Sequence, residues 1–152
     1  MRHLFAVLGL TLALLPNPVA AASSDWISVT GGAVRLISAG PPEAGVYHAG
    51  LEFSLDPGWH TYWRFPGEAG IPPQTDFSAS SNVGAIEMKF PAPARYDDGF
   101  TTSIVYNDGV VLPMLVTPVA PGQPVTLKAD VFFGVCKEIC VPGNGSFELT
   151  LK

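Results

Sequence analysis

Cys136 and Cys140 are the only cysteines in the sequence, and they stand four positions apart near its end. On one continuous strand, residues with this spacing lie about 13 Å from each other, whereas a disulfide needs Cα atoms within about 7 Å. We therefore expect a hairpin whose arms end at Cys136 and Cys140 and whose loop is Lys137-Glu138-Ile139. Opposed residues of an antiparallel pair lie about 4.5–5.5 Å apart, which suits a bridge between the arms.

A disulfide in so small a ring has two possible roles. In the chain-entropy model, a ring of about five residues stabilises a fold by only about 2 kcal/mol. A bridge in such a ring is also expected to be strained, and strain makes a disulfide easier to reduce. These features favour a redox pair, and an ordinary structural bridge of an exported domain is the alternative.

The segment before Cys136 indicates which way its side chain points. Alternate residues from Val125 to Val135 are apolar and share one face of a long predicted strand. Cys136 then belongs to the opposite face, so we expect the bridge to lie near solvent at the outer end of the strand. Accessible thiols are the reactive ones, and this position therefore favours the redox role.

The segment from Trp59 to Arg64 is dense in aromatic residues. On a strand, Trp59 and Trp63 share one face and are expected in the core, while His60 and Tyr62 share the other. His60 and Tyr62 would then line a polar site that shuttles protons or orients a thiolate. The alternative is that both are ordinary surface residues of a sheet.

Residues 95–101 follow a proline pair and precede a strand, so we predict a loop. It holds Phe100 next to two acids, Asp97 and Asp98. Phe100 is either an aromatic anchor for this loop or part of a mobile lid, because lids and anchors look alike in sequence.

A metal site is a further hypothesis, since two thiolates and a histidine are ligands for copper or zinc. Beyond the N-terminal segment the histidines are His48 and His60. The cysteine motif lacks a second His/Cys pair close by, which a structural zinc site would need. We therefore expect no bound metal and no cofactor, with a periplasmic copper-binding protein as an alternative.

The N-terminal residues have the features of a secretory signal peptide. Arg2 supplies the positive start, residues 4–15 form an apolar run too short to span a bilayer, and small residues follow at 19–22. We expect a signal peptide over 1–22 and one exported domain over 23–152.

Charge narrows the range of partners. The sequence has 8 Lys and Arg against 13 Asp and Glu, and it contains no basic run. This balance argues against a nucleic-acid partner and against an anionic membrane surface. No segment after the signal is apolar for long enough to insert in a bilayer, so we expect a soluble exported domain.

The mature part alternates between short apolar-periodic segments and turns, which is typical of antiparallel strands. Asn107-Asp108-Gly109 is a strong hairpin signal between two of them. The absence of a clear 3.6-residue period predicts an all-β fold, an immunoglobulin-like β-sandwich. The predicted strands cover 28–30, 34–38, 47–55, 59–65, 86–90, 102–106, 110–116, 125–135 and the segment that carries Phe147, Leu149 and Leu151.

Several motifs, in their order, resemble the amino-terminal periplasmic domain of DsbD/ScsB-type thiol:disulfide interchange proteins. The resemblance covers most of the mature chain. The motifs are Gly58-Trp59-His60-Thr61-Tyr62-Trp63-Arg64, Gly67, Ile71-Pro72-Pro73, Phe90-Pro91-Ala92-Pro93, Val111-Leu112-Pro113, Pro121-Gly122-Gln123-Pro124 and Cys136-Lys137-Glu138-Ile139-Cys140-Val141-Pro142.

The resemblance implies a role for each matching position. Cys136 and Cys140 become the redox pair, and the second cysteine of the pair is the one that joins the partner. His60, Tyr62 and Glu138 become site-lining residues. Asp97, Asp98 and Phe100 belong to a cap loop whose aromatic residue shields the cysteines.

The resemblance also implies partners and a compartment. In that family the domain takes electrons from a transmembrane thiol reductase and passes them to periplasmic thioredoxin-fold proteins. The family usually continues into a membrane domain, whereas this sequence stops at Lys152, so we expect a separate or orphaned module. The sequence thus predicts a periplasmic protein-disulfide reductase. A β-sandwich binding module with a structural disulfide is the alternative from another class.

Overall fold

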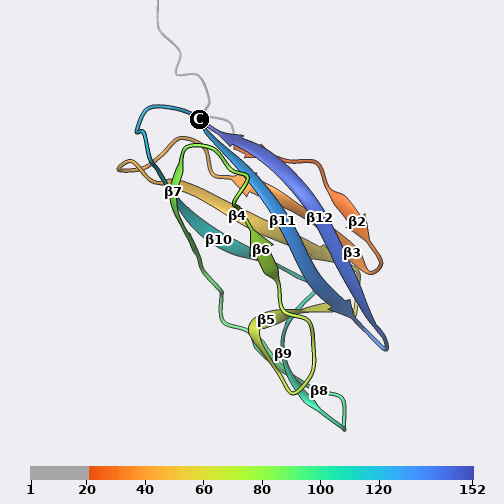
Figure 1. Ribbon diagram of the computed structural model, residues 1–152. Coiled ribbons are helices and arrows are strands. Elements are labelled where there is room, and N and C mark those ends of the chain that lie inside the picture. The colour runs from red at the N-terminus through yellow and green to blue at the C-terminus, as the bar shows by residue number, and fades with distance from the viewer. Residues whose placement is uncertain (1–20) are drawn as a thin grey trace, which may run out of the picture.

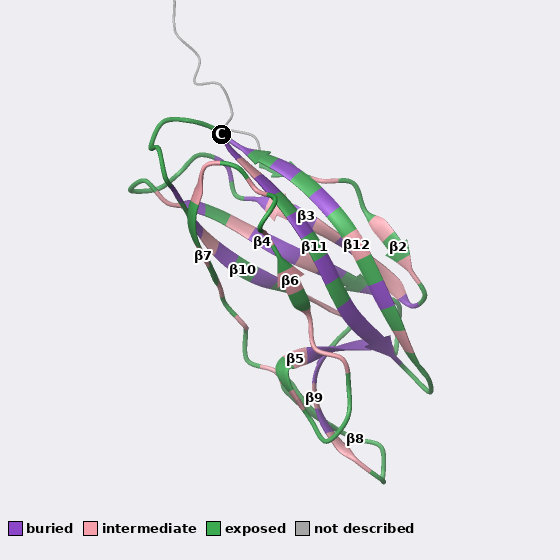
Figure 2. Ribbon diagram, viewed as in Figure 1, coloured by how far each residue is buried: buried purple, intermediate pink, exposed green. Residues whose placement is uncertain are grey.

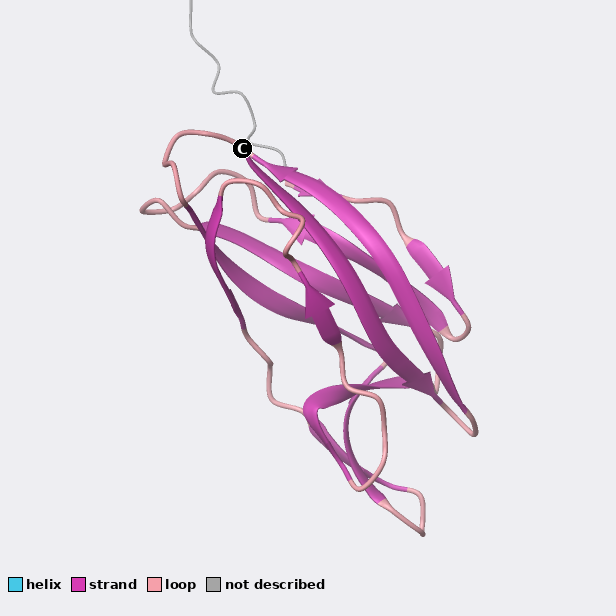
Figure 3. Cartoon of the chain, viewed as in Figure 1, coloured by secondary structure: helices cyan, strands magenta, loops and turns pink. Residues whose placement is uncertain are grey.

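The computed structural model describes residues 21–152, and the predicted signal peptide falls almost wholly outside them. Every paired strand in this range is antiparallel, and the strands form two sheets packed face to face (Figure 1). Figure 3 shows strands and loops alone, with no helix in the described part. Residues 21–152 accordingly contain no helix long and apolar enough to cross a membrane. The predicted all-β, immunoglobulin-like sandwich is confirmed.

The first sheet has the strand order β1-β3-β4-β10-β7, with β2 paired to β3. Its strands are β1 (Ala22–Ser23), β2 (Ile27–Val29), β3 (Gly32–Ser38), β4 (Tyr47–Leu55), β7 (Val83–Met88) and β10 (Gly109–Pro118). Burial alternates along β4, where Leu51 and Phe53 are buried and Ser54 is exposed, as the period-2 pattern predicts.

The second sheet has the order β12-β11-β5-β9-β8, with β6 paired to β11. Its strands are β5 (His60–Gly67), β6 (Gln74–Asp76), β8 (Ala94–Asp97), β9 (Thr102–Asn107), β11 (Val125–Cys136) and β12 (Cys140–Leu151). The long hairpin of β11 and β12 ends beside β5, and β8 and β9 extend beyond it (Figure 1).

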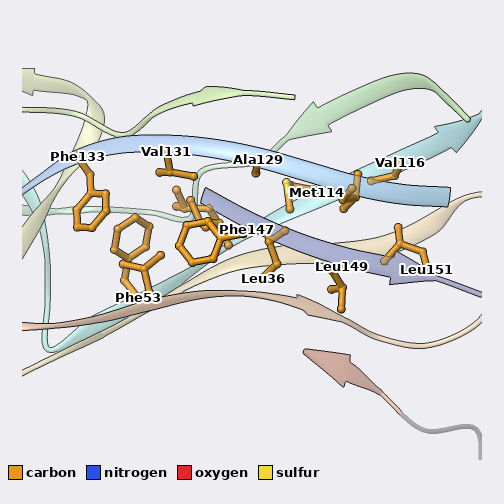
Figure 4. Packing of buried hydrophobic residues seen from close by; sticks show 14 of the residues in the cluster. Leu36, Phe53, Met114, Val116, Ala129, Val131, Phe133, Phe147, Leu149 and Leu151 are labelled. Carbon is orange, nitrogen blue, oxygen red and sulfur yellow. The ribbon is translucent and has the colours of Figure 1, made fainter. Parts of the chain in front are cut away.

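The core lies between the two sheets and is formed by the apolar faces of their strands (Figure 2). Phe133 of β11 packs edge-on against Phe53 of β4, with ring centroids 5.2 Å apart. Phe147, Leu149 and Leu151 of β12 are buried in the same cluster (Figure 4). Aromatic and branched aliphatic side chains supply most of the free energy of such a core.

The predicted hairpin at Asn107-Asp108-Gly109 is wrong, because β9 and β10 belong to different sheets. Asn107 pairs with His60 of β5, whereas Gly109 pairs with Ser54 of β4. Asp108 and Gly109 do adopt the positive φ angles that this sequence favours. Instead of closing a hairpin, however, the backbone of Asp108 bonds to Leu55 and Trp59, at the two ends of the β4–β5 turn.

The predicted loop at 95–101 is also partly wrong. Ala94–Asp97 is a strand, β8, and it pairs with β9 over its whole length. All four residues of β8 are exposed, so the strand has no buried face that would create an alternating pattern. The true turn is confined to the four residues from Asp98 to Thr101.

Candidate functional site

Cys136 and Cys140 end the two arms of the β11–β12 hairpin and are bonded to each other. They pair directly in the antiparallel register, with their Cα atoms 4.1 Å apart. A backbone bond from Lys137 N to Ile139 O closes the loop between them. The predicted hairpin and its disulfide are therefore confirmed.

The two cysteines differ in their access to solvent. Cys136 is only 2% exposed, whereas Cys140 is exposed. The bridge was expected near solvent, and this holds for Cys140 but not for Cys136, although the predicted face of Cys136 is right. Cys136 points away from the main core and forms a separate buried cluster with Tyr62 and Val105, which cover it from β5 and β9.

Tyr62 contacts both cysteines. Its hydroxyl donates a hydrogen bond to Cys136 Sγ at 2.8 Å and lies 3.3 Å from Cys140 Sγ. Burial raises the pKa of Tyr62, and the nearby Tyr96 and Asp98 raise it further. The phenol therefore keeps its proton near neutral pH and acts as a donor.

The loop after β5 covers Tyr62. Gly70 has a φ of +123°, and a Cβ placed there would lie 2.2 Å from the Tyr62 ring. The neighbouring Ile71 accepts a hydrogen bond from Gly134 N through its carbonyl. This loop must therefore have glycine at position 70 to approach the ring, and it fixes Tyr62 over the disulfide.

His60 lies beside the disulfide in the sheet. It pairs with Cys136 across β5 and β11, and its side chain is 4% exposed. Its ring meets Tyr62 edge-on at 5.4 Å and lies 4.6 Å from the Tyr96 ring of β8. Burial lowers the pKa of His60 below its ordinary value of 6.5. The surface alternative for His60 and Tyr62 is thus wrong, because both are buried.

The carboxylate of Asp98 stabilises the turn from Asp98 to Thr101. Asp98 Oδ1 accepts hydrogen bonds from the amides of Phe100 and Thr101, at 2.8 and 2.7 Å. These bonds lower the pKa of Asp98 below its ordinary value. Asp97 Oδ1 accepts from the amide of Gly99, at 2.9 Å. The Phe100 side chain is 95% exposed, so it is not a packed anchor in this structure.

A cleft of about 400 Å³ joins these groups at the end of the sandwich. It brings together all but one of the residues that the sequence indicated, and Asp97 is the exception. Tyr96 is an important member that the sequence reasoning did not single out, because the flat exposure of β8 hides its pairing. The predicted members that line the cleft are His60, Tyr62, Asp98, Phe100, Cys136, Glu138 and Cys140.

The arrangement suits thiol–disulfide exchange. An exposed sulfur offers a point of attack, and a buried sulfur beside it is held by a hydrogen-bond donor. No group of three or more His, Cys, Asp or Glu residues is gathered closely enough to hold a metal ion anywhere in residues 21–152.

Comparison with known protein families shows to which family this chain belongs. The model of the family described as "Thiol:disulfide interchange protein DsbD, N-terminal" matches residues 36–152. The chain belongs to this family. The resemblance inferred from the sequence motifs is confirmed, and the protein is a thiol:disulfide interchange domain with a cysteine pair. Among curated proteins, none matches the chain significantly.

Two solved structures of DsbD-type domains are similar to the chain. The N-terminal periplasmic domain of ScsB from Proteus mirabilis has a TM-score of 0.70 and 26% identity, over 86% of this chain and 51% of its own. The chain thus spans about half the length of that ScsB structure. The reduced N-terminal domain of DsbD from Neisseria meningitidis has a TM-score of 0.39 and 19% identity, over 72% of this chain and 88% of its own.

Proposed function

We propose that this DsbD-type domain relays electrons in the periplasm through Cys136 and Cys140. The donor is a transmembrane thiol reductase, the acceptors are thioredoxin-fold proteins, and the activity is that of a protein-disulfide reductase. The observation that carries the proposal is the unequal burial of the two bonded cysteines, whose sulfurs both lie next to the Tyr62 hydroxyl. A bridge that served only as a staple would not need one sulfur exposed in a cleft.

The two cysteines have different roles in this proposal. In the reduced domain, Cys140 loses its proton and attacks a disulfide of the partner as a thiolate, and the first partner thiolate leaves. Cys136 then attacks Cys140 Sγ as a thiolate, which re-forms the Cys136–Cys140 bond and releases the second partner thiolate. Two electrons pass to the partner, and its two sulfurs take up protons. Both electrons travel through the two cysteines, and the exchange needs no bound cofactor.

The cap-loop role of Asp97, Asp98 and Phe100 is part of the same proposal. The carboxylates of Asp97 and Asp98 hold the turn through backbone amides, and this turn carries Phe100 at the mouth of the cleft. An exposed aromatic on a short turn is free to cover Cys140 or to meet a partner surface. The site-lining residues are His60 and Tyr62, both on β5, and Glu138 in the loop of the β11–β12 hairpin.

The N-terminal sequence and the relatives support a periplasmic location for this domain. A signal peptide over 1–22, with the domain at 23–152, would deliver the chain to the periplasm. The similar ScsB structure is itself a periplasmic domain. Disulfides form and persist in that compartment, which suits a protein that cycles between dithiol and disulfide.

Direct electron transfer tests the proposal. The reduced protein is mixed with an oxidised thioredoxin-fold protein, quenched with acid, alkylated and analysed by mass spectrometry. We expect this chain to gain its disulfide while the partner gains two alkylated thiols, in a one-to-one ratio. A variant with both Cys136→Ser and Cys140→Ser is the control and should transfer nothing. If the parent protein stays reduced in the presence of an oxidised partner of higher reduction potential, the proposed function is wrong.

A further inference from the structure

His60 occupies the place in the sheet that lies directly beside the buried cysteine. Cys140, Cys136 and His60 form one continuous row across β12, β11 and β5. Directly opposed residues of an antiparallel sheet project to the same face, with Cβ atoms about 4.5–5.5 Å apart. The imidazole and the Cys136 sulfur therefore emerge side by side, in the same cleft.

Cys136 needs a partner of opposite charge if it is to react as a thiolate. It is 2% exposed and packs against Tyr62 and Val105, so water does not stabilise a negative charge on its sulfur. A buried thiol in such surroundings resists ionisation and is inert. The Tyr62 hydroxyl supplies one neutral hydrogen bond, and a neutral bond compensates only part of the cost of a buried charge.

The imidazole of His60 has aromatic neighbours while the disulfide is intact. Among the hydrogen bonds and ion pairs found within residues 21–152, none involves the imidazole of His60. Tyr62 and Tyr96 contact its ring from β5 and β8. The charged groups that line the same cleft are Asp98, Glu138 and Lys137, of which the two acids favour a protonated imidazole and the lysine opposes it.

We propose that His60 is the charge partner of the Cys136 thiolate in the reduced domain. When a donor dithiol reduces the bridge, the Cys136–Cys140 bond breaks and the donor forms its own disulfide. One of the two donor protons goes to Cys140 as a thiol, and the other goes to the imidazole of His60, leaving Cys136 as a thiolate. In the reverse direction the imidazolium keeps Cys136 ready to attack Cys140 Sγ and release the partner. This inference rests on the proposed redox role of the pair.

The two states of the disulfide therefore differ in the charge of His60. Burial disfavours the imidazolium alone and the thiolate alone, but the two charges stabilise each other when they form together. His60 should titrate below its ordinary value in the disulfide form, in agreement with the lowered pKa, and at a higher pH in the reduced form. Because of this coupling, the reduction potential of the domain depends on pH in a way that the cysteines alone would not produce.

Histidine NMR titrations of the oxidised protein and of the chemically reduced protein test the inference without any partner protein. We expect the His60 midpoint to rise on reduction, and a His48→Gln variant, changed at an exposed position, should show the same rise. Equal His60 midpoints in the two states would overturn the inference, and would leave the electron-relay proposal intact.

A second measurement isolates the buried thiol. In the Cys140→Ala variant, Cys136 is the single thiol, and its thiolate fraction is followed by ultraviolet absorbance as a function of pH. Adding His60→Gln should lower the thiolate fraction near neutral pH about tenfold, the change expected for a shift of about one pKa unit. Adding His48→Gln should have no effect. A His60→Gln curve that coincides with that of its parent would contradict the role of His60.

Discussion

Replacement of Cys136 by alanine should trap a mixed disulfide between Cys140 and a thioredoxin-fold partner. Cys140 is exposed and lines the cleft, whereas Cys136 is buried against Tyr62 and Val105. An incoming thiolate must approach in line with the bond that breaks, and only the Cys140 sulfur offers that approach. Without Cys136 no thiol of this chain can resolve the adduct, so it should accumulate. Mass spectrometry of the alkylated, non-reduced mixture identifies the bonded cysteine.

The reciprocal variant is the matched control. Cys140→Ala leaves a single thiol that is 2% exposed, and we expect it to form little adduct under the same conditions. Dominant trapping through Cys136 would reverse the assignment of roles. The absence of an adduct from both variants would count against exchange with that partner.

Replacement of Phe133 by alanine should lower the free energy of unfolding by about 3–5 kcal/mol, the usual cost of removing a buried phenylalanine. Phe133 is 1% exposed, lies near the C-terminal end of β11 and packs edge-on against Phe53 of the opposite sheet (Figure 4). The substitution leaves a cavity between the two sheets that rigid strands cannot close. Urea unfolding followed by tryptophan fluorescence measures the change.

Two other phenylalanines serve as controls for this prediction. Phe132 is the next residue of β11 but faces outward and is 41% exposed, and Phe100 is 95% exposed on the cap turn. Phe132→Ala should cost far less than Phe133→Ala, and Phe100→Ala should change stability by no more than about 0.5 kcal/mol. A large loss of stability in Phe100→Ala would show that Phe100 packs against the fold in solution and is not part of an open cap.

The strands with one buried face were predictable, because burial of one face requires apolar and polar residues to alternate along the strand. Residues 47–55 and 125–135 alternate in sequence, and they form β4 and most of β11. The hairpin of the cysteine pair was also predictable, because the short spacing and the geometry of a disulfide leave few other paths for the chain.

Other parts of the fold depend on contacts that no local pattern encodes. Asp108 takes the backbone conformation of a hairpin turn, yet its bonds to Leu55 and Trp59 lead the chain into the other sheet. A turn sequence specifies backbone angles, and it does not specify which strands pair. β8 is exposed throughout, so its pairing with β9 left no periodic signal.

In the site, the orientation of Cys136 was also predictable from its own strand, whereas its burial was not. Alternation along β11 correctly placed Cys136 on the face opposite the core. Its burial comes from Tyr62, a residue 74 positions away along the chain, and from the loop that holds Tyr62 in place. The pattern of one strand reports which way a side chain points, but it cannot report what covers that side.

The reduction potential of the Cys136–Cys140 pair tests the central claim most directly. The protein is equilibrated in buffers of defined thiol–disulfide ratio, and both forms are quantified by alkylation and mass spectrometry. Structural disulfides of exported proteins usually lie below about −300 mV, and pairs that carry electrons lie above it. The redox role, the small ring and the exposed Cys140 predict a potential above that line, with full reduction by thioredoxin. A potential well below it, together with a native protein that thioredoxin cannot reduce, would show that the bridge is structural.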